Sequence, residues 1–267
     1  MIRGILIPIF VLAASLPAAA PAAQPERERL SLDQGWLFHQ GDIPFPEVTG
    51  HTMTYQSAKA GAALGAAAQA FDDTGWSEVD LPHDWASHSP ISKDANIAQG
   101  YRARGFGWYR RHFQVDPAER GKHFELQFDG VSTHCTVWVN GTVVHRNWCG
   151  YTSFSADITP LLKYGDEFNS VAVRVDAEAQ EGWWYEGAGI YRHTWLVKRS
   201  PVHIVTDGVF AQPVRAPDGK WSIPAEVTLA NSGEKNAKPK VEVTLLDPEG
   251  KPVGTVSQSC EVVALGE

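Results

Sequence analysis

Four consecutive residues have side chains that could contact a sugar. Trp183, Trp184, Tyr185 and Glu186 lie in a predicted loop ahead of a segment that alternates like a β-strand. The flat face of a tryptophan or tyrosine can stack on a pyranose ring, or it can pack against a neighbouring protein surface. Large aromatic residues dominate cores and interfaces, so packing against a neighbour is the more common use. The sequence leaves both uses open.

Asp84 is a second candidate, because it lies between His83 and Trp85. His83 and Asp84 have the residue types of an acid–base pair. However, neighbouring residues of an extended segment point to opposite sides, so the two are poorly placed to act together. Buried charges are normally paired, and we therefore expect Asp84 to form an ion pair with Arg110 or Arg111. The alternative is that Asp84 borders a sugar site.

The composition describes a globular protein and excludes several kinds of site. The 267 residues suffice for one large or two ordinary domains, and 43% of them are hydrophobic. The formal net charge of −8 comes with no basic stripe, which argues against a nucleic-acid partner. The 10 histidines and 3 cysteines show no metal-ligand spacing, so we expect no metal and no cofactor.

Two of the three cysteines could form a disulfide. Cys135 and Cys149 flank a predicted hairpin and could pair in an oxidising compartment. They are not directly opposite each other, so two buried free thiols are an equal alternative. Cys260 is left without a partner in either case.

Residues 1–23 predict a signal peptide. Arg3 supplies a positive charge, Gly4 to Leu16 is an apolar run of about a dozen residues, and Ala18 to Ala23 offers small residues at the cleavage site. The run is shorter than the ~20 residues of a membrane span, although an uncleaved anchor is the alternative. We expect the mature chain to be periplasmic or secreted, with no membrane attachment after cleavage.

Residues 24–200 show the pattern of an all-β sandwich. Leu30 to His39 predicts a first strand, and from Gly107 onward the period of two is plain. Asn140-Gly141 is the strongest two-residue hairpin signal in the chain. Ser57 to Phe71 is rich in alanine and glycine and could be a short helix or an irregular insertion. Many short strands with almost no helical periodicity predict a jelly-roll β-sandwich.

Residues 201–267 predict a second, smaller unit. Val202 to Phe210, Ile223 to Ala230, Val241 to Asp247 and Val253 to Val262 read as four plain strands with polar turns between them. An immunoglobulin-like sandwich needs about seven strands. We therefore expect an incomplete immunoglobulin-like β-sandwich, truncated at its end and open on its inner face.

Several motifs follow one another in a fixed order through the first unit. They are Leu81-Pro82-His83-Asp84-Trp85, Gly107-Trp108-Tyr109-Arg110-Arg111, Phe128-Asp129-Gly130-Val131, Val137-Trp138-Val139-Asn140-Gly141, Gly150-Tyr151-Thr152-Ser153-Phe154, Asp157-Ile158-Thr159, Val171-Ala172-Val173-Arg174-Val175-Asp176 and Trp184-Tyr185-Glu186-Gly187-Ala188-Gly189-Ile190-Tyr191-Arg192. Together they resemble the N-terminal sugar-binding part of glycoside hydrolase family 2, nearest to its β-galactosidases. The resemblance covers about Leu30 to Arg199.

The resemblance implies a mode of action. Family members follow the jelly roll with an immunoglobulin-like domain and a (β/α)₈ barrel, whose two glutamates hydrolyse a glycosidic bond with retention. A barrel of that type needs about 250 residues, for which this chain has no room, so we expect no catalytic residue in it. In the family the loop at Trp184 and Tyr185 approaches the active site. Relatives commonly have a charged residue where this chain has Trp183, which argues against a direct polar contact with substrate there.

The sequence thus predicts the N-terminal, non-catalytic portion of a secreted, β-galactosidase-like family 2 glycoside hydrolase. Asp84, Trp183, Trp184, Tyr185 and Glu186 would border a site for a galactoside-type carbohydrate, completed by the missing catalytic barrel domain. We expect no hydrolysis by the chain alone. Two alternatives are a free-standing carbohydrate-binding module and a subunit that complements a separate barrel chain.

Overall fold

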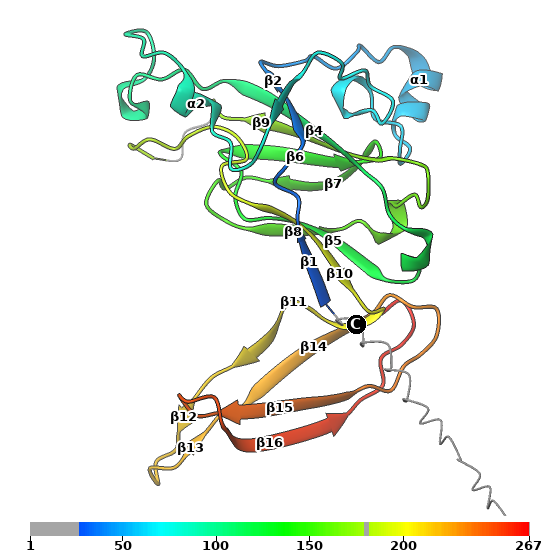
Figure 1. The fold of residues 1–267 in the computed structure, drawn as a ribbon, viewed down its shortest axis with the longest axis vertical. Coiled ribbons are helices and arrows are strands. Elements are labelled where there is room, and N and C mark those ends of the chain that lie inside the picture. The colour runs from blue at the N-terminus through cyan, green and yellow to red at the C-terminus, as the bar shows by residue number, and fades with distance from the viewer. Residues whose placement is uncertain (1–26, 179–181, 267) are drawn as a thin grey trace, which may run out of the picture.

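The computed structural model describes residues 27–178 and 182–266. The predicted signal peptide, residues 1–23, lies outside the described residues. The described chain is built from antiparallel strands with a few short helices, which confirms the predicted all-β class. Figure 1 shows two layered bodies, one above the other, joined where β10 (Thr194–Arg199) leads into β11 (Val202–Ala211).

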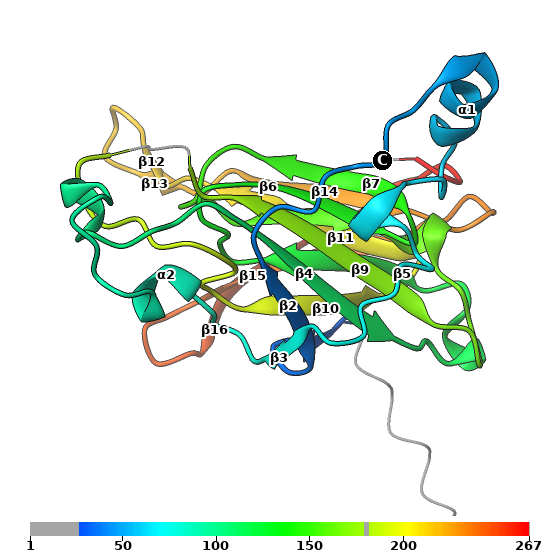
Figure 2. The same cartoon turned by 90° about the horizontal axis from the view of Figure 1, so that it is seen from above.

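The first body is a sandwich of two sheets. One has four strands in the order β1-β10-β5-β8, and the other has six in the order β3-β2-β4-β9-β6-β7. Helices α1 (Gly50–Ser57) and α2 (Trp85–His88) lie near opposite ends of the six-stranded sheet (Figures 1 and 2). The strands are β1 (Arg27–Ser31), β2 (Trp36–Gln40), β3 (Ser77–Val79), β4 (Phe106–Phe113), β5 (His123–Phe128), β6 (His134–Val139), β7 (Thr142–Asn147), β8 (Phe154–Asp157), β9 (Asn169–Asp176) and β10 (Thr194–Arg199).

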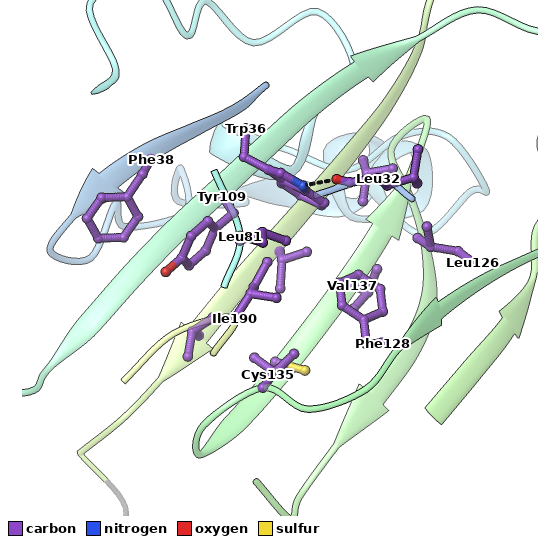
Figure 3. Packing of buried hydrophobic residues seen from close by; sticks show 14 of the residues in the cluster. Leu32, Trp36, Phe38, Leu81, Tyr109, Leu126, Phe128, Cys135, Val137 and Ile190 are labelled. Carbon is purple, nitrogen blue, oxygen red and sulfur yellow. Dashed lines mark hydrogen bonds between the residues drawn. The ribbon is translucent and has the colours of Figure 1, made fainter. Parts of the chain in front are cut away.

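The apolar core lies between the two sheets. Inward-facing residues of both sheets meet there, and Trp36 is fixed by a 2.6 Å hydrogen bond from its Nε1 to the carbonyl of Leu32 (Figure 3). A smaller cluster covers the outer face of the six-stranded sheet, where Trp108 stacks on Trp138 with ring centroids 5.6 Å apart. The alanine- and glycine-rich segment contributes buried alanines to this cluster through a 3₁₀ turn, Gly65–Ala67.

The predicted hairpin at Asn140-Gly141 is present. Both residues have positive φ, +48° and +75°, as a two-residue turn between twisted strands demands. A Cβ atom on Gly141 would lie 2.7 Å from the carbonyl oxygen of Gly61, so glycine is required for packing as well as for φ. The turn joins β6 to β7 at the edge of the six-stranded sheet.

The predicted first strand, Leu30 to His39, is two strands in different sheets. β1 pairs with β10 in the four-stranded sheet, whereas β2 pairs with β3 and β4 in the six-stranded sheet. Gly35 at φ +72° turns the chain between them, and the Trp36 side chain bonds back to Leu32 across that turn. Alternation continues through both halves, so periodicity alone does not show the crossing.

The second body has the four predicted long strands and an additional small ribbon. Strand β11 (Val202–Ala211) pairs with β14 (Ala225–Asn231), β15 (Lys240–Leu246) pairs with β16 (Pro252–Ser259), and the ribbon joins β12 (Val214–Arg215) to β13 (Trp221–Ser222). Many of its large apolar side chains are exposed, among them Ile204, Val209, Phe210, Trp221, Ile223, Leu245, Leu246, Val253 and Val256. Among the described residues, no helix is long and apolar enough to cross a bilayer.

Arg110 is a charged side chain with no exposed surface. Its guanidinium donates to the Asp73 carboxylate at 2.7 Å and to the backbone carbonyls of Ala66, Ala68 and Gln69. Arg110 thereby fastens the segment 66–73 over the outer face of the six-stranded sheet. We predict that Arg110→Met lowers the free energy of unfolding by about 3 kcal/mol, because a partly buried carboxylate and three carbonyls lose their donor.

The matched control is Arg174→Met, measured by urea unfolding alongside the first variant. Arg174 also pairs with an aspartate, Asp42, at 2.7 Å, but both side chains are partly exposed. Exposed pairs contribute about 1 kcal/mol or less, so the control should lose far less stability. Equal losses in the two variants would contradict the role assigned to Arg110.

The three cysteines are free thiols in different surroundings. Cys135 is buried, and burial raises its pKa to about 12, whereas Cys149 and Cys260 are partly exposed. We predict that a thiol reagent at pH 8 labels Cys149 and Cys260 in the native chain and Cys135 only after unfolding, because the thiolate is the reacting form. If Cys135 and Cys149 both stayed unlabelled in denaturant without reductant, they would be disulfide-bonded instead.

Candidate functional site

Four of the five predicted site residues, Trp183 to Glu186, lie on one loop at the end of the first sandwich that carries α2, and Asp84 lies beside this loop at the start of α2. Residues 182–190 are part of the connection between β9 and β10, and their second half is bound by backbone hydrogen bonds on both sides. The amide of His83 donates to the carbonyl of Ile190, and the amide of Trp85 donates to that of Ala188. On the other side, Ser132 and Gly189 exchange amide–carbonyl bonds at 2.9 and 3.0 Å. The loop is therefore held like an inserted strand.

Asp84 is the residue that organises this region. Its Oδ1 accepts hydrogen bonds from the amides of Ala86 and Ser87, which caps α2, and from the amide of Ala188 at 2.9 Å. Its Oδ2 accepts the Tyr185 hydroxyl at 2.7 Å. Asp84 thus connects the start of one element to the loop that carries the aromatic residues.

The expected ion pair of Asp84 with Arg110 or Arg111 is wrong. Arg110 points to the outer face of the six-stranded sheet and pairs with Asp73, while Arg111 donates to the Leu32 carbonyl. Asp84 instead satisfies its charge with backbone amides, which a helix N-terminus provides without any cation. His83 points elsewhere and hydrogen-bonds the Tyr109 hydroxyl through Nδ1, so His83 and Asp84 do not act as a pair.

Two glycines make the close approach to Asp84 possible. Gly187 has φ +73° and Gly189 has φ +121°. A Cβ atom on Gly187 would lie 2.8 Å from Oδ2 of Asp84, and one on Gly189 would collide with the Tyr109 hydroxyl. Both positions therefore require glycine for space as well as for conformation.

Glu186 is buried and anchors a second loop. Its Oε2 accepts from Arg104 Nη1 at 2.8 Å and from Gln99 Nε2 at 3.0 Å, and Gln99 also bonds the backbone of Trp184 and Glu186. Arg104 reaches on to the Thr133 hydroxyl. The loop 89–105 is fastened to the aromatic loop in this way. Sequence reasoning missed Gln99 and Arg104, because nothing in a long irregular stretch marks a residue that bonds 82 to 87 positions away.

The aromatic side chains of this loop face solvent, although its backbone is fixed. Exposed fractions are 94% for Trp183, 56% for Trp184 and 41% for Tyr185. Trp184 Nε1 donates to the hydroxyl of Tyr151 at 2.6 Å, which brings a residue from the 147–154 turn beside them. We call Tyr151, Trp183, Trp184 and Tyr185 the aromatic rim. The rim is a surface of exposed rings beside an anchored stretch of backbone, the kind of surface on which a pyranose or another protein domain can pack.

The charges at the rim support structure, not acid–base chemistry. Asp84 accepts several protein hydrogen bonds, and Glu186 is ion-paired and buried. Burial, together with the Asp84 hydrogen bond, raises the pKa of Tyr185 far above its usual value, so the phenol stays protonated as a donor. Glycoside hydrolysis needs two carboxyl groups free to serve as acid and nucleophile or base. Asp84 and Glu186 are not available for these roles.

The chain was compared with known families at the level of sequence and structure. A family model described as glycosyl hydrolases family 2, sugar binding domain, matches residues 62–200. The chain belongs to glycosyl hydrolase family 2. The matched range contains Asp84, the aromatic rim and Glu186, and it ends at the joint between the two bodies.

Individual family 2 proteins match over most of the chain. β-Galactosidase BoGH2A of Bacteroides ovatus is 36% identical over 241 residues, which cover 89% of this chain and 26% of that protein. A solved family 2 member from Bacteroides cellulosilyticus is 35% identical with a TM-score of 0.69, covering 88% of this chain and 28% of the other. A β-glucuronidase of Bacteroides uniformis is 26% identical with a TM-score of 0.74, covering 90% and 26%. The chain thus spans about a quarter of the length of these relatives.

We predict that Asp84→Ala loosens the aromatic rim. Removing the carboxylate leaves three amides and the Tyr185 hydroxyl without their acceptor, so local opening should become easier by about 2 kcal/mol, or roughly 30-fold. Hydrogen exchange at Ala86 and Ala188 measures this opening.

Asp116→Ala is the matched control, because Asp116 also caps a short helix, η3 (Pro117–Glu119), through the Ala118 amide. It makes no contact with the rim, so exchange at Ala188 should be unchanged. Unchanged exchange at Ala188 in Asp84→Ala would contradict the organising role of Asp84.

Proposed function

We propose that the chain is the non-catalytic N-terminal portion of an exported, β-galactosidase-like glycoside hydrolase. The first sandwich borders a sugar site, and a catalytic barrel domain of the kind that the resemblance implies supplies the two glutamates. The match to about a quarter of each family 2 relative supports a role as one part of a larger enzyme. The predicted signal peptide supports export to the periplasm or the outside.

The aromatic rim is the observation that carries the proposal. Its backbone is fixed by Asp84, Gln99 and strand-like bonds, yet Trp183 and Trp184 leave large ring areas exposed. Ordering a loop costs conformational entropy, and this loop is already ordered in the unbound chain, so binding a partner would cost less entropy. A preorganised apolar surface of this kind suits a sugar ring, a docked domain, or both at the border between them.

The second body supports the same reading. We propose that residues 24–200 form the jelly-roll domain and that residues 201–267 begin an immunoglobulin-like domain. Its exposed apolar residues, such as Phe210 and Leu246, then face strands that complete its sandwich. An isolated pair of two-stranded sheets is only marginally stable in water, which favours further strands in the working protein.

The substrate class is proposed from the relatives. Relatives that match the chain in sequence are named β-galactosidase, β-glucuronidase or putative β-glucuronidase, so a β-glycoside is the shared element. We propose a galactoside-type carbohydrate, because BoGH2A and the enzyme of Thermoanaerobacter pseudethanolicus, 33% identical over 181 residues, are both named β-galactosidases.

A free-standing carbohydrate-binding module is the second candidate, and the exposure of Trp183 favours it. Such a module binds sugar without a partner domain. A subunit that complements a separate barrel chain is a variant of the main proposal and uses the same rim for docking.

Hydrolysis and binding assays on the purified chain separate these possibilities. We predict no release of nitrophenol from nitrophenyl β-galactoside above the buffer rate, because the carboxylates beside the rim in the described part of the chain, Asp84 and Glu186, are both held in protein contacts. Titration with methyl β-galactoside, followed by tryptophan fluorescence, should show weak binding or none.

Measurable release of nitrophenol by the purified chain would contradict the non-catalytic assignment, and loss of that turnover in Asp84→Asn or Glu186→Gln would exclude a contaminating hydrolase as its source. Saturable binding at submillimolar sugar that is lost in Trp184→Ala, but kept in the matched exposed variant Trp221→Ala of the second body, would favour the free-standing module.

A further inference from the structure

A cluster of histidine and carboxylate side chains lies at the joint between the two bodies. His123 and Glu125 are two residues apart on β5, so they share the face that does not point into the core. His203 comes from the start of β11 in the second body. One possible ligand atom from each of these three residues lies within 4.8 Å of the other two.

Hydrogen bonds orient both imidazoles in the same sense. His203 Nδ1 lies 3.1 Å from the carbonyl oxygens of Ser200 and Pro201, and because carbonyls only accept, Nδ1 carries the proton. His123 Nδ1 faces the Thr159 hydroxyl at 3.3 Å and the Asp157 carboxylate at 3.8 Å. A metal-binding histidine usually donates its remote N–H to a carbonyl or a carboxylate in this way. The Nε2 atom of His203 is then left for another partner, whereas Nε2 of His123 faces the Glu125 carboxylate, where a cation would take the place of the proton between them.

The carboxylate completes the donor set. Glu125 Oε1 lies 3.3 Å from His123 Nε2, which is close to the spacing of two ligands on one tetrahedral Zn²⁺. Glu125 Oε2 accepts from the Thr206 hydroxyl at 2.6 Å and from Gln127 at 3.1 Å, so the carboxylate cannot rotate freely. The imidazoles of His123 and His203 stack with centroids 4.2 Å apart, so both rings lie on the same side of the joint as Glu125.

We propose that His123, Glu125 and His203 bind a divalent cation of the zinc class that clamps the first body to the second. Two imidazoles and one carboxylate suit Zn²⁺, Co²⁺ or Ni²⁺, and three protein ligands leave a fourth position for water. A cleft of about 1070 Å³ between the bodies has His203 and Arg199 in its wall, so the ion and its water reach the site from solvent.

Arg199 limits the affinity of this site. Its Nη1 lies 2.5 Å from Glu125 Oε1, the same oxygen that the cation needs, and its Nη2 donates to Thr206. The cation shares that oxygen with a guanidinium and is repelled by its charge. We therefore expect micromolar binding, weaker than in dedicated structural zinc sites. The same arrangement makes a specific prediction: removing the positive charge tightens binding.

The experiment is a titration of the purified chain, without a histidine tag, with ZnCl₂ in a calorimeter at pH 7.5. We expect one ion per chain. Co²⁺ replaces Zn²⁺ in a second titration, in which tetrahedral ligand-field bands report imidazole and carboxylate ligands. Loss of affinity by tenfold or more is expected in His203→Ala and in Glu125→Gln.

Two variants separate a metal site from a merely structural cluster. His193→Ala is the matched control, because His193 also faces a carboxylate, Asp33 at 2.7 Å, but lies within the first body, and it should leave binding unchanged. Arg199→Gln should bind Zn²⁺ several-fold more tightly, although it loses an ion pair. His203 is only partly buried, so His203→Ala is the variant to measure if Glu125→Gln fails to fold.

Three results would overturn the proposal. They are no binding below millimolar Zn²⁺, binding that His203→Ala does not weaken, and equal weakening by His193→Ala. None of these outcomes bears on whether the chain belongs to a glycosidase, since the clamp and the aromatic rim share no residue.

Discussion

One carboxylate determines where the aromatic rim of the first sandwich lies. Asp84 closes the N-terminus of α2, holds the Ala188 amide and receives the Tyr185 hydroxyl. Each of these partners would otherwise be a polar group left unpaired in a partly buried place, at a cost of about 1–3 kcal/mol. The hydrogen bonds from Ala188 and Tyr185 to Asp84 hold the loop of the aromatic rim in its position. The approach is so close that Gly187 and Gly189 have no room for a side chain.

Local signals in the sequence predicted local structure well. Asn140-Gly141 predicts its hairpin because asparagine and glycine are the residues that most readily adopt the positive φ of a two-residue turn. The alternating strands predict the all-β class because burial on one face of a strand imposes a period of two. The prediction of one strand over Leu30 to His39 was wrong. The alternation of apolar and polar residues continues where the chain crosses from one sheet to the other, and Gly35 alone marks the crossing in this stretch.

Partners in tertiary contacts were much harder to predict. The rule that a buried charge needs a partner is correct for Asp84, but it does not say whether that partner is an arginine or a set of amides. Arg110 binds Asp73 and three backbone carbonyls on the outer face of the six-stranded sheet, away from Asp84. The sequence predicted no metal site, because His123 and His203 are 80 positions apart and only the joint brings them together. The exposure of Trp183 and its neighbours also depends on the fold, since the same residues would suit a core.

The two bodies therefore have different characters. The first has a complete core and a preorganised rim, whereas the second exposes much of its apolar surface and is attached through a polar joint. This contrast, together with the match to about a quarter of each relative, is what a part of a larger glycosidase would show.

The most direct measurement is the mass of the native protein, detected in its producing cells with an antibody against the first sandwich. Because 241 residues of the chain cover 26% of its Bacteroides ovatus relative, the account predicts a native chain about three and a half times as long. A native species no longer than residues 1–267, with no longer form, would contradict it.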